Sequence, residues 1–274
     1  MLRKIRPIET IKLFFATLLS VLLLFFVFKY VLFYVIGWNT GLNLDWYNVY
    51  YPAIQQADPF TVWGYFNPPW LAWMLSPLGK LSAGDSHVLW IVIVLMLTVR
   101  CVYALGGGWF GALLTILSPG FFVAVVNGQV DVLVLLGIVT GSWLLVLIKP
   151  QVAGMSLVYD VLANRRIDWF AVAFTAVCGV AFLLFMARPE AAGLRSTLTV
   201  TPWPWGIPVG LALFVWALLR RDKGLSVLST FFLVPYISAS SMFVYSAVGT
   251  SKYGRFVAIL FFVAMWLRGL HWIT

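Results

Sequence analysis

Asp45 is the residue whose type and context best suit chemistry. It lies in a polar loop, Asn39–Pro69, that follows the first long apolar segment of the chain. An ionised carboxylate can accept a proton from an attacking hydroxyl group, so Asp45 is a candidate general base. A helix that begins after Leu44 would instead make Asp45 an N-cap residue, and the sequence leaves both interpretations open.

The same loop is rich in aromatic side chains, which accept two interpretations. Trp and Tyr gather at membrane–water interfaces, and aromatic faces also stack on sugar rings, so the cluster favours neither interpretation alone. The aromatic residues are Trp46, Tyr47, Tyr50, Tyr51, Phe60, Trp63, Tyr65, Phe66, Trp70 and Trp73.

The other acids of this region suggest structural roles. Asp58 precedes Pro59, which favours a turn, and Asp85 precedes an apolar run, where it could cap a helix. Lys29 lies in the outer half of the first apolar segment, and we expect it to extend to the interface or to form an ion pair.

Three polar or helix-breaking interruptions lie within otherwise apolar sequence. Polar groups at membrane depth are costly unless they line a cavity or find partners. Each interruption could be a helix cap, but together with Asp45 they predict a polar pocket open to the outer leaflet. They are Asn127-Gly128-Gln129 with Asp131, then Lys149-Pro150-Gln151, and then Pro235-Tyr236.

Several classes of site are excluded by residue type and spacing. His87 and His271 are far apart, and no Cys or carboxylate stands near either at metal-ligand spacing, so we expect no metal and no cofactor. Cys101 and Cys178 lie in apolar segments and are interpreted as buried small hydrophobic residues. The formal net charge of +9 comes from basic residues in short gaps between apolar runs, which predicts membrane topology and no nucleic-acid partner.

Composition predicts an integral membrane protein. Of the 274 residues, 62% are hydrophobic and 10% are charged, more apolar surface than a soluble domain of this length can bury. Basic residues precede the apolar run Leu13–Ile36, which is longer than the core of a signal peptide. We therefore expect an uncleaved first span, a cytoplasmic N-terminus, and a multi-pass protein of the cell membrane.

The chain is interpreted as one all-α transmembrane domain, residues 1–274, with about eight or nine membrane segments. Residues 39–86 form an extracytoplasmic loop with interfacial helices, and Trp70–Leu78 is too short to cross. A bend is expected at Pro119-Gly120. Between Val130 and Ala163, either the first apolar piece crosses and the second is re-entrant, or the first is a re-entrant hairpin and the second crosses. The further segments are His87–Leu105, Trp109–Val126, Trp169–Ala187, Trp205–Leu219, Leu225–Tyr236, Phe243–Thr250 and Phe256–Trp272.

These motifs, in this order, resemble the GT-C glycosyltransferases, and most closely the polyprenyl-phosphate-mannose-dependent branch called glycosyltransferase family 87. The resemblance covers about Met1 to Tyr245. The residues that carry it are Asp45, Tyr51-Pro52-Ala53, Asp58-Pro59-Phe60, Phe66-Asn67-Pro68-Pro69, Asn127-Gly128-Gln129-Val130-Asp131, Lys149-Pro150-Gln151 and Pro235-Tyr236.

The resemblance implies an inverting transferase that moves a mannose-like sugar from a polyprenyl-phosphate donor to an extracytoplasmic acceptor. Asp45 would be the general base. The departing lipid phosphate needs a cation, for which Lys149, Arg188 and Arg195 are candidates. Membrane lipid surrounds such an enzyme, and no metal is required. The expected substrate-binding residues are Asn127, Gln129, Asp131, Lys149, Gln151 and Tyr236.

Two other functions compete with this one. Family members typically carry an additional helical pair between the Asn-Gly-Gln and Lys-Pro-Gln motifs, whereas here only Val130–Ile148 separates them. A non-catalytic membrane subunit, with protein partners in a larger complex, would suit a shortened chain. A transporter or lipid flippase is disfavoured by the sparse intramembrane charge and the absence of an internal repeat.

Overall fold

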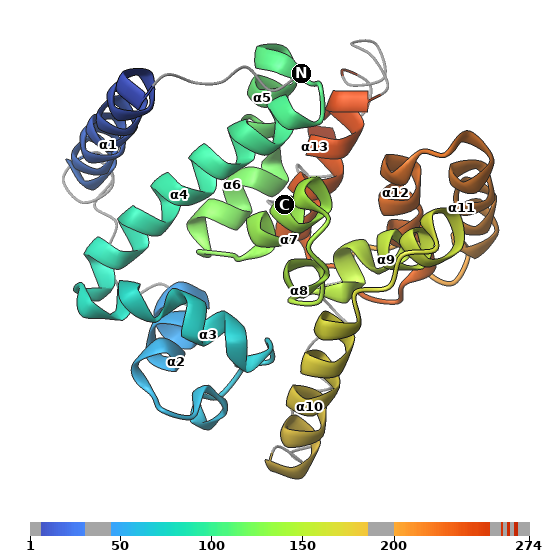
Figure 1. Ribbon diagram of the computed structural model, residues 1–274, viewed down its shortest axis with the longest axis horizontal. Coiled ribbons are helices and arrows are strands. Elements are labelled where there is room, and N and C mark those ends of the chain that lie inside the picture. Colours follow the sequence, from blue (N-terminus) through green and yellow to red (C-terminus); the bar gives the residue numbers. More distant parts are fainter. Residues whose placement is uncertain are drawn as a thin grey trace.

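The described part of the chain is all-helical. The computed structural model describes residues 7–30, 45–185 and 200–252, together with 259, 262–263 and 266–267. Within these ranges every regular element is a helix, which confirms the all-α prediction (Figure 1). The core is one large apolar cluster centred on helices α4 (Ala83–Ala104), α7 (Asp131–Thr140) and α13 (Met242–Lys252). A smaller cluster lies between α9 (Pro150–Asn164), α11 (Ile207–Arg220) and α12 (Lys223–Leu233).

Helices α1 (Pro7–Tyr30) and α4 (Ala83–Ala104) are joined by an ion pair. Lys29 Nζ lies 2.6 Å from Asp85 Oδ1, so the expected pairing of Lys29 is confirmed. The prediction that Asp85 caps α4 is wrong. Ser82 is the N-cap and accepts a hydrogen bond from the backbone N–H of Asp85, which stands in the first turn, where a carboxylate also interacts favourably with the helix dipole.

The first loop folds into short helices beneath the start of α4. These are η2 (Trp46–Tyr50), α2 (Tyr51–Gln55), η3 (Pro59–Thr61), α3 (Pro69–Leu75) and η4 (Ser76–Lys80). Asp58 accepts a hydrogen bond from Phe60 N at 2.9 Å, which confirms its turn role. Asp45 stands at the N-cap position of η2, but its side chain makes no capping hydrogen bond, and its carboxylate contacts Gln129 instead.

The expected bend at Pro119 is confirmed and is sharp. Helix α5 (Gly108–Ile116) and α6 (Pro119–Val126) meet at 61°, with Ser118 capping α6 through the N–H of Phe121. Pro119 occupies the first turn of α6, where its missing N–H is not needed. The turn before α5 uses Gly106 and Gly108, both with positive φ.

The region after α6 forms a hairpin. Helix α7 (Asp131–Thr140) ends at Gly141, whose φ of 72° reverses the chain into the single turn α8 (Trp143–Val146). A side chain at Gly137 would place its Cβ 2.8 Å from Leu145 Cβ, so α7 and α8 pack at glycine-only distance. The hairpin returns Lys149 to the start of α7, where it contacts Asp131, and this shape is common to the re-entrant alternative for Val130–Ile148. Which of the two pieces crosses the membrane stays a prediction.

The remaining helices complete the bundle. Helix α9 (Pro150–Asn164) packs on α12 (Lys223–Leu233), which also packs on α11 (Ile207–Arg220). Helix α13 (Met242–Lys252) lies against α4, α5 and α6, whereas α10 (Trp169–Phe185) extends away from the bundle (Figure 1). Residues 31–44, which include the end of the predicted first span, lie outside the described residues. Most of the predicted segment Phe256–Trp272 lies outside them as well.

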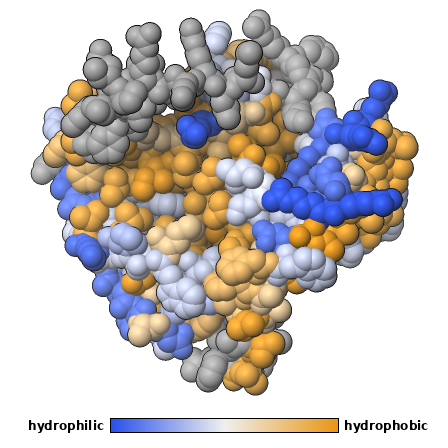
Figure 2. All heavy atoms as spheres, viewed as in Figure 1, coloured by the Kyte–Doolittle hydropathy of each residue, from blue (hydrophilic) through white to orange (hydrophobic). Residues whose placement is uncertain are grey.

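One described helix, α4, is long and apolar enough to cross a membrane, and the bent pair α5–α6 would add a second crossing if it counts as one span. Five described helical stretches are apolar but shorter: Leu19–Tyr30, Asp131–Thr140, Trp169–Val180, Ile207–Arg220 and Lys223–Leu233. Hydrophobic residues cover much of the face in Figure 2. The number of membrane segments stays a prediction.

Candidate active site

A cavity of about 740 Å³ lies where the first loop, the α8–α9 turn, α10 and the segment before α13 meet. It is partly open to the surface, and its wall mixes aromatic, proline and polar residues. The first loop contributes Asp45, Tyr50, Trp63, Phe66, Asn67 and Trp70. The rest of the chain contributes Gln129, Lys149, Gln151, Thr175, Cys178, Gly179, Tyr236 and Ser238, among others.

The Asn-Gly-Gln turn positions Gln129 at this cavity because the first loop holds it. The backbone N–H of Trp46 donates to the carbonyl of Asn127 at 3.0 Å. Gly128 has a φ of 64°, and a Cβ there would lie 2.6 Å from Trp46 Cβ. Only glycine satisfies both the left-handed backbone and this close approach.

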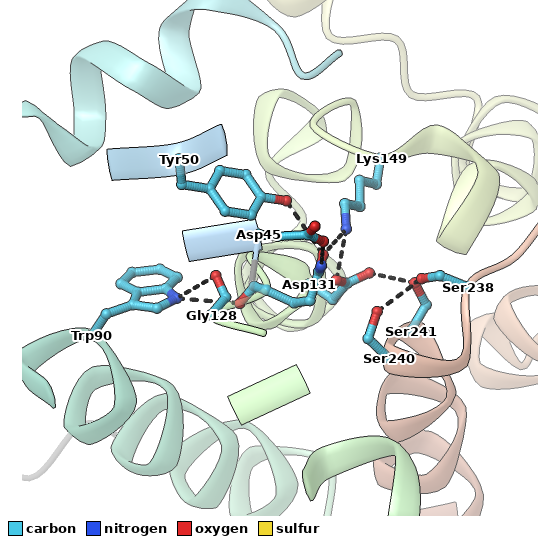
Figure 3. Close-up of polar contacts among 10 residues, drawn as sticks. Asp45, Tyr50, Trp90, Gly128, Asp131, Lys149, Ser238, Ser240 and Ser241 are labelled. Carbon is cyan, nitrogen blue, oxygen red and sulfur yellow. Dashed lines mark hydrogen bonds and ion pairs between the residues drawn. The ribbon is translucent and has the colours of Figure 1, made fainter. Parts of the chain in front are cut away.

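Two buried tryptophans fix the turn further. Trp90 Nε1 is 3.2 Å from the carbonyl oxygens of both Gly128 and Gln129 (Figure 3). Trp46 stacks on Trp90 and on His87, and its Nε1 donates to Ser86 Oγ at 3.1 Å. The turn is therefore anchored to α4, which gives Gln129 a fixed position.

The side chain of Gln129 joins Asp45 to Lys149. Its Nε2 donates to Asp45 Oδ2, while its Oε1 accepts from Lys149 Nζ at 2.7 Å and from Tyr50 Oη at 3.3 Å (Figure 3). The carboxylate on one side and the two donors on the other set the orientation of the amide. A carboxylate and an ammonium group thus share one wall of the cavity.

Lys149 is balanced by a second, buried carboxylate. Its Nζ lies 2.8 Å from Asp131 Oδ2, and the Asp131 side chain has no solvent exposure. Asp131 Oδ1 accepts from Ser241 Oγ at 2.6 Å, and Ser241 in turn contacts Ser238 at 2.9 Å (Figure 3). Such a buried pair requires hydrogen bonds to its remaining atoms, and Ser241 supplies one of them.

Burial and charge shift the pKa values of two groups in this network. Burial raises the pKa of Tyr50 to about 12, although Lys149 opposes the shift, so Tyr50 remains a hydrogen-bond donor at neutral pH. For Lys149, burial alone would lower the pKa, but the carboxylate of Asp131 and other nearby acidic groups raise it above its usual range. Lys149 is therefore a fixed positive charge.

The predicted site residues fall into three groups. Asp45, Gln129, Lys149, Gln151 and Tyr236 line the cavity, and Asp131 lies directly behind Lys149. The side chain of Asn127 is not among the lining groups; its backbone carbonyl serves the contact with Trp46. Arg188 and Arg195 lie outside the described residues.

Sequence reasoning missed the residues that hold the network together. The sequence marks Trp46, Tyr50 and Trp90 only as aromatic or apolar residues and gives no signal at Ser241. The two tryptophan contacts span about forty residues, and the contact of Ser241 with Asp131 spans 110, so no local spacing indicates them. Among the described residues, no group of three or more His, Cys, Asp or Glu side chains could hold a metal ion.

Comparison with known proteins gives no relative from which a function could be inferred: no family model, curated protein or solved structure matches this chain.

Proposed function

We propose that this chain is a polytopic membrane glycosyltransferase of the GT-C type, with about eight or nine membrane segments, that transfers a mannose-like sugar from a polyprenyl-phosphate donor. The observation that carries the proposal is the single hydrogen-bonded network of Asp45, Gln129 and Lys149 on the wall of one cavity. The apolar composition and the exposed hydrophobic side chains support the membrane location.

In the proposed reaction Asp45 is the general base. The acceptor hydroxyl loses its proton to the Asp45 carboxylate while its oxygen attacks the anomeric carbon of the donor sugar. The bond from that carbon to the phosphate oxygen breaks, and the polyprenyl phosphate leaves with the electron pair. Attack opposite the leaving group inverts the anomeric centre.

Lys149 would stabilise the leaving phosphate. An ammonium group has three N–H donors, and Gln129 and Asp131 are the described acceptors of two of them, so one is available to a ligand. However, the charge of Lys149 is already balanced by Asp131. A leaving phosphate therefore needs further positive charge, which we assign to Arg188 or Arg195 of the second outer loop.

The aromatic wall suits a sugar. Tyr50, Trp63, Phe66 and Trp70 line the cavity, so that flat rings are available beside the polar network. Asn67, Gln151 and Tyr236 add groups that can form hydrogen bonds with hydroxyl groups. A pocket with few polar groups among aromatic rings fits an uncharged hexose better than a highly charged substrate.

A non-catalytic subunit is the second candidate, and α10 is the observation that favours it. This helix extends from the bundle and exposes large apolar side chains that could contact a partner protein as well as lipid. The exposed residues on or just before α10 are Ile167, Trp169, Phe170, Val172, Val177, Val180 and Leu184.

The test is the Asp45→Asn variant, with Asp58→Asn as its control. Asp58 lies in the same loop, but its carboxylate accepts a bond from Phe60 N and is not among the groups lining the cavity. We expect Asp45→Asn to slow the release of polyprenyl phosphate from polyprenyl-phosphate mannose by about 10²–10⁴-fold, with unchanged thermal stability. Full activity in that variant would remove Asp45 from the mechanism. Inactive wild-type protein with a stoichiometric partner would favour the subunit.

A further inference from the structure

Two basic turns that are far apart in the sequence lie together at one end of the bundle. Arg165 and Arg166 follow α9, and Arg220 and Arg221 end α11. The backbone N–H of Arg166 donates to the carbonyl of Asp160 at 3.0 Å, and Lys223 Nζ lies 2.6 Å from the carboxylate of that same residue. The two turns are thus linked through Asp160.

Apolar packing reinforces this link. Tyr159 near the end of α9, Phe214 and Ala217 of α11, and Leu225 of α12 form one buried cluster. Arg165 and Arg221 each have a left-handed backbone, with φ of 51° and 52°, at the residue that ends its helix. Both helices therefore end close to this cluster, with their basic residues in the turns that follow.

The four arginines are exposed, and the nearby acids are engaged elsewhere. Among the ion pairs between described residues, none involves Arg165, Arg166, Arg220 or Arg221. Asp160 is paired with Lys223, and Asp168 and Asp222 accept hydrogen bonds from the backbone N–H groups of Ala171 and Gly224. The result is a local excess of positive charge.

Exposed apolar side chains border this basic cluster. Leu162 and Leu219 are 58% and 78% exposed, and Trp169 and Trp216 are 70% and 49% exposed. In Figure 2, hydrophilic side chains extend from the side of the molecule that α9, α11 and α12 form, next to hydrophobic surface. Basic groups beside exposed apolar and Trp side chains are the pattern of a membrane interface.

The position of the cluster relative to the cavity fits this pattern. Helix α9 begins at Pro150, next to Lys149 at the cavity, and ends at Asn164, next to Arg165. Its 15 residues are kinked at Ala153 and span at most about 22 Å, which is shorter than the roughly 30 Å hydrocarbon core of a bilayer. The cavity and the basic cluster therefore lie at opposite ends of α9, the arrangement that positions in opposite leaflets require.

We propose that Arg165, Arg166, Arg220 and Arg221 form a binding surface for the phosphate groups of anionic phospholipids in the leaflet opposite the cavity. Each guanidinium group can donate two parallel hydrogen bonds to a phosphate, and the bordering Trp and Leu side chains contact the acyl region. This inference depends on the membrane location proposed above but not on the transferase chemistry, so sugar-transfer assays cannot decide it.

The experiment measures thermal unfolding of the detergent-solubilised full chain with added dioleoyl phosphatidylglycerol or dioleoyl phosphatidylcholine. We expect phosphatidylglycerol to raise the Tm by roughly 5 °C more than phosphatidylcholine does at low salt. The difference should disappear when all four arginines are replaced by Gln. It should remain in the variant with four Lys residues and in Lys80→Gln, which removes an exposed basic residue elsewhere.

Salt dependence of the wild-type protein provides a second measurement if the four-Gln variant does not fold. The phosphatidylglycerol effect should fall steeply between about 0.05 and 0.5 M NaCl, because exposed charges are screened. Equal stabilisation by the two lipids, an effect that salt does not change, or an undiminished effect in the four-Gln variant would overturn the proposal. Equal stabilisation by water-soluble glycerol phosphate would also overturn it, since that result would indicate a free-phosphate site.

Discussion

Lys149 Nζ lies 2.8 Å from a carboxylate oxygen of Asp131, and the Asp131 side chain has no solvent exposure. Only 11% of the Lys149 side chain is exposed, at the cavity. The pair therefore has one charge facing the site and one enclosed by protein. This arrangement keeps a cation at the cavity without leaving its countercharge free to compete for a substrate.

Breaking this pair should be costly. Asp131→Asn leaves the Lys149 cation without its countercharge, and we expect a loss of about 3–5 kcal/mol in unfolding free energy. Lys29→Met breaks the exposed pair with Asp85, whose side chains are 40% and 31% exposed, and should cost about 0–1 kcal/mol. Thermal unfolding in detergent compares the two. Similar losses of unfolding free energy in the two variants would show that the burial of Asp131 does not determine how much its ion pair contributes to stability.

Gly128→Ala should destabilise the protein and disturb Gln129. The left-handed backbone adds about 1 kcal/mol of strain for alanine, and the new Cβ would force Trp46 to move, for a total of roughly 2–3 kcal/mol. The control is Gly154→Ala, where a Cβ meets no atom within 4 Å, and which should be neutral or slightly stabilising. Thermal unfolding curves of the two variants in detergent would measure the difference. A Gly128→Ala protein as stable as wild type would contradict the close contact.

Alkaline pH should destabilise the protein partly through Tyr50. Its pKa is raised from 10.0 to about 12, so the folded state holds the phenol proton more tightly than the unfolded chain does. The corresponding stability, roughly 2–3 kcal/mol, is present below pH 10 and is lost as the pH rises toward about 12.

The Tyr50→Phe variant isolates this contribution. Its Tm should fall less steeply than that of wild type between about pH 10 and 11.5. Tyr51→Phe keeps Tyr50 and so should keep the steep decline. Identical slopes for wild type and Tyr50→Phe would remove Tyr50 from this pH dependence.

Replacing Arg188 or Arg195 should lower the activity toward the polyprenyl-phosphate donor without lowering the stability of the protein. If one of them supplies the second positive charge for the leaving phosphate, its replacement by Gln should lower kcat/KM for polyprenyl-phosphate mannose by about 10²-fold, as expected when a group that stabilises developing charge is lost. Lys80→Gln is the control for loss of one exposed positive charge. Wild-type kcat/KM in both variants would leave Lys149 as the sole candidate cation.

Local signals in the sequence predicted much of the fold. The turn at Asp58 and the bend at Pro119 both follow from a residue whose backbone preference acts within a few positions. The hairpin of α7 and α8 was one of two alternatives, because apolar periodicity does not distinguish a crossing helix from a helix that reverses at Gly141.

The sequence predicts the polar groups of the candidate site but not the residues that hold them in place. Asp45, Gln129 and Lys149 stand out because each is polar in an apolar or interfacial setting. Trp46, Trp90 and Ser241 do not stand out, because a buried tryptophan or serine is ordinary in a helical bundle and its hydrogen-bond partner is determined by tertiary packing. The sequence is also ambiguous at short range: either Ser82 or Asp85 could cap α4, and the structure has Ser82 at the N-cap.

The contact between Ser241 and Asp131 has a consequence for biosynthesis. Asp131 lies in the first half of the chain, but its partner Ser241 emerges from the ribosome 110 residues later. During insertion, the nascent polypeptide must hold an incompletely solvated acid until the serine-rich segment before α13 arrives. Chains interrupted before residue 238 would therefore carry Asp45 without a finished pocket around it, so that arrested translation products are expected to be inactive and favoured substrates for membrane quality control.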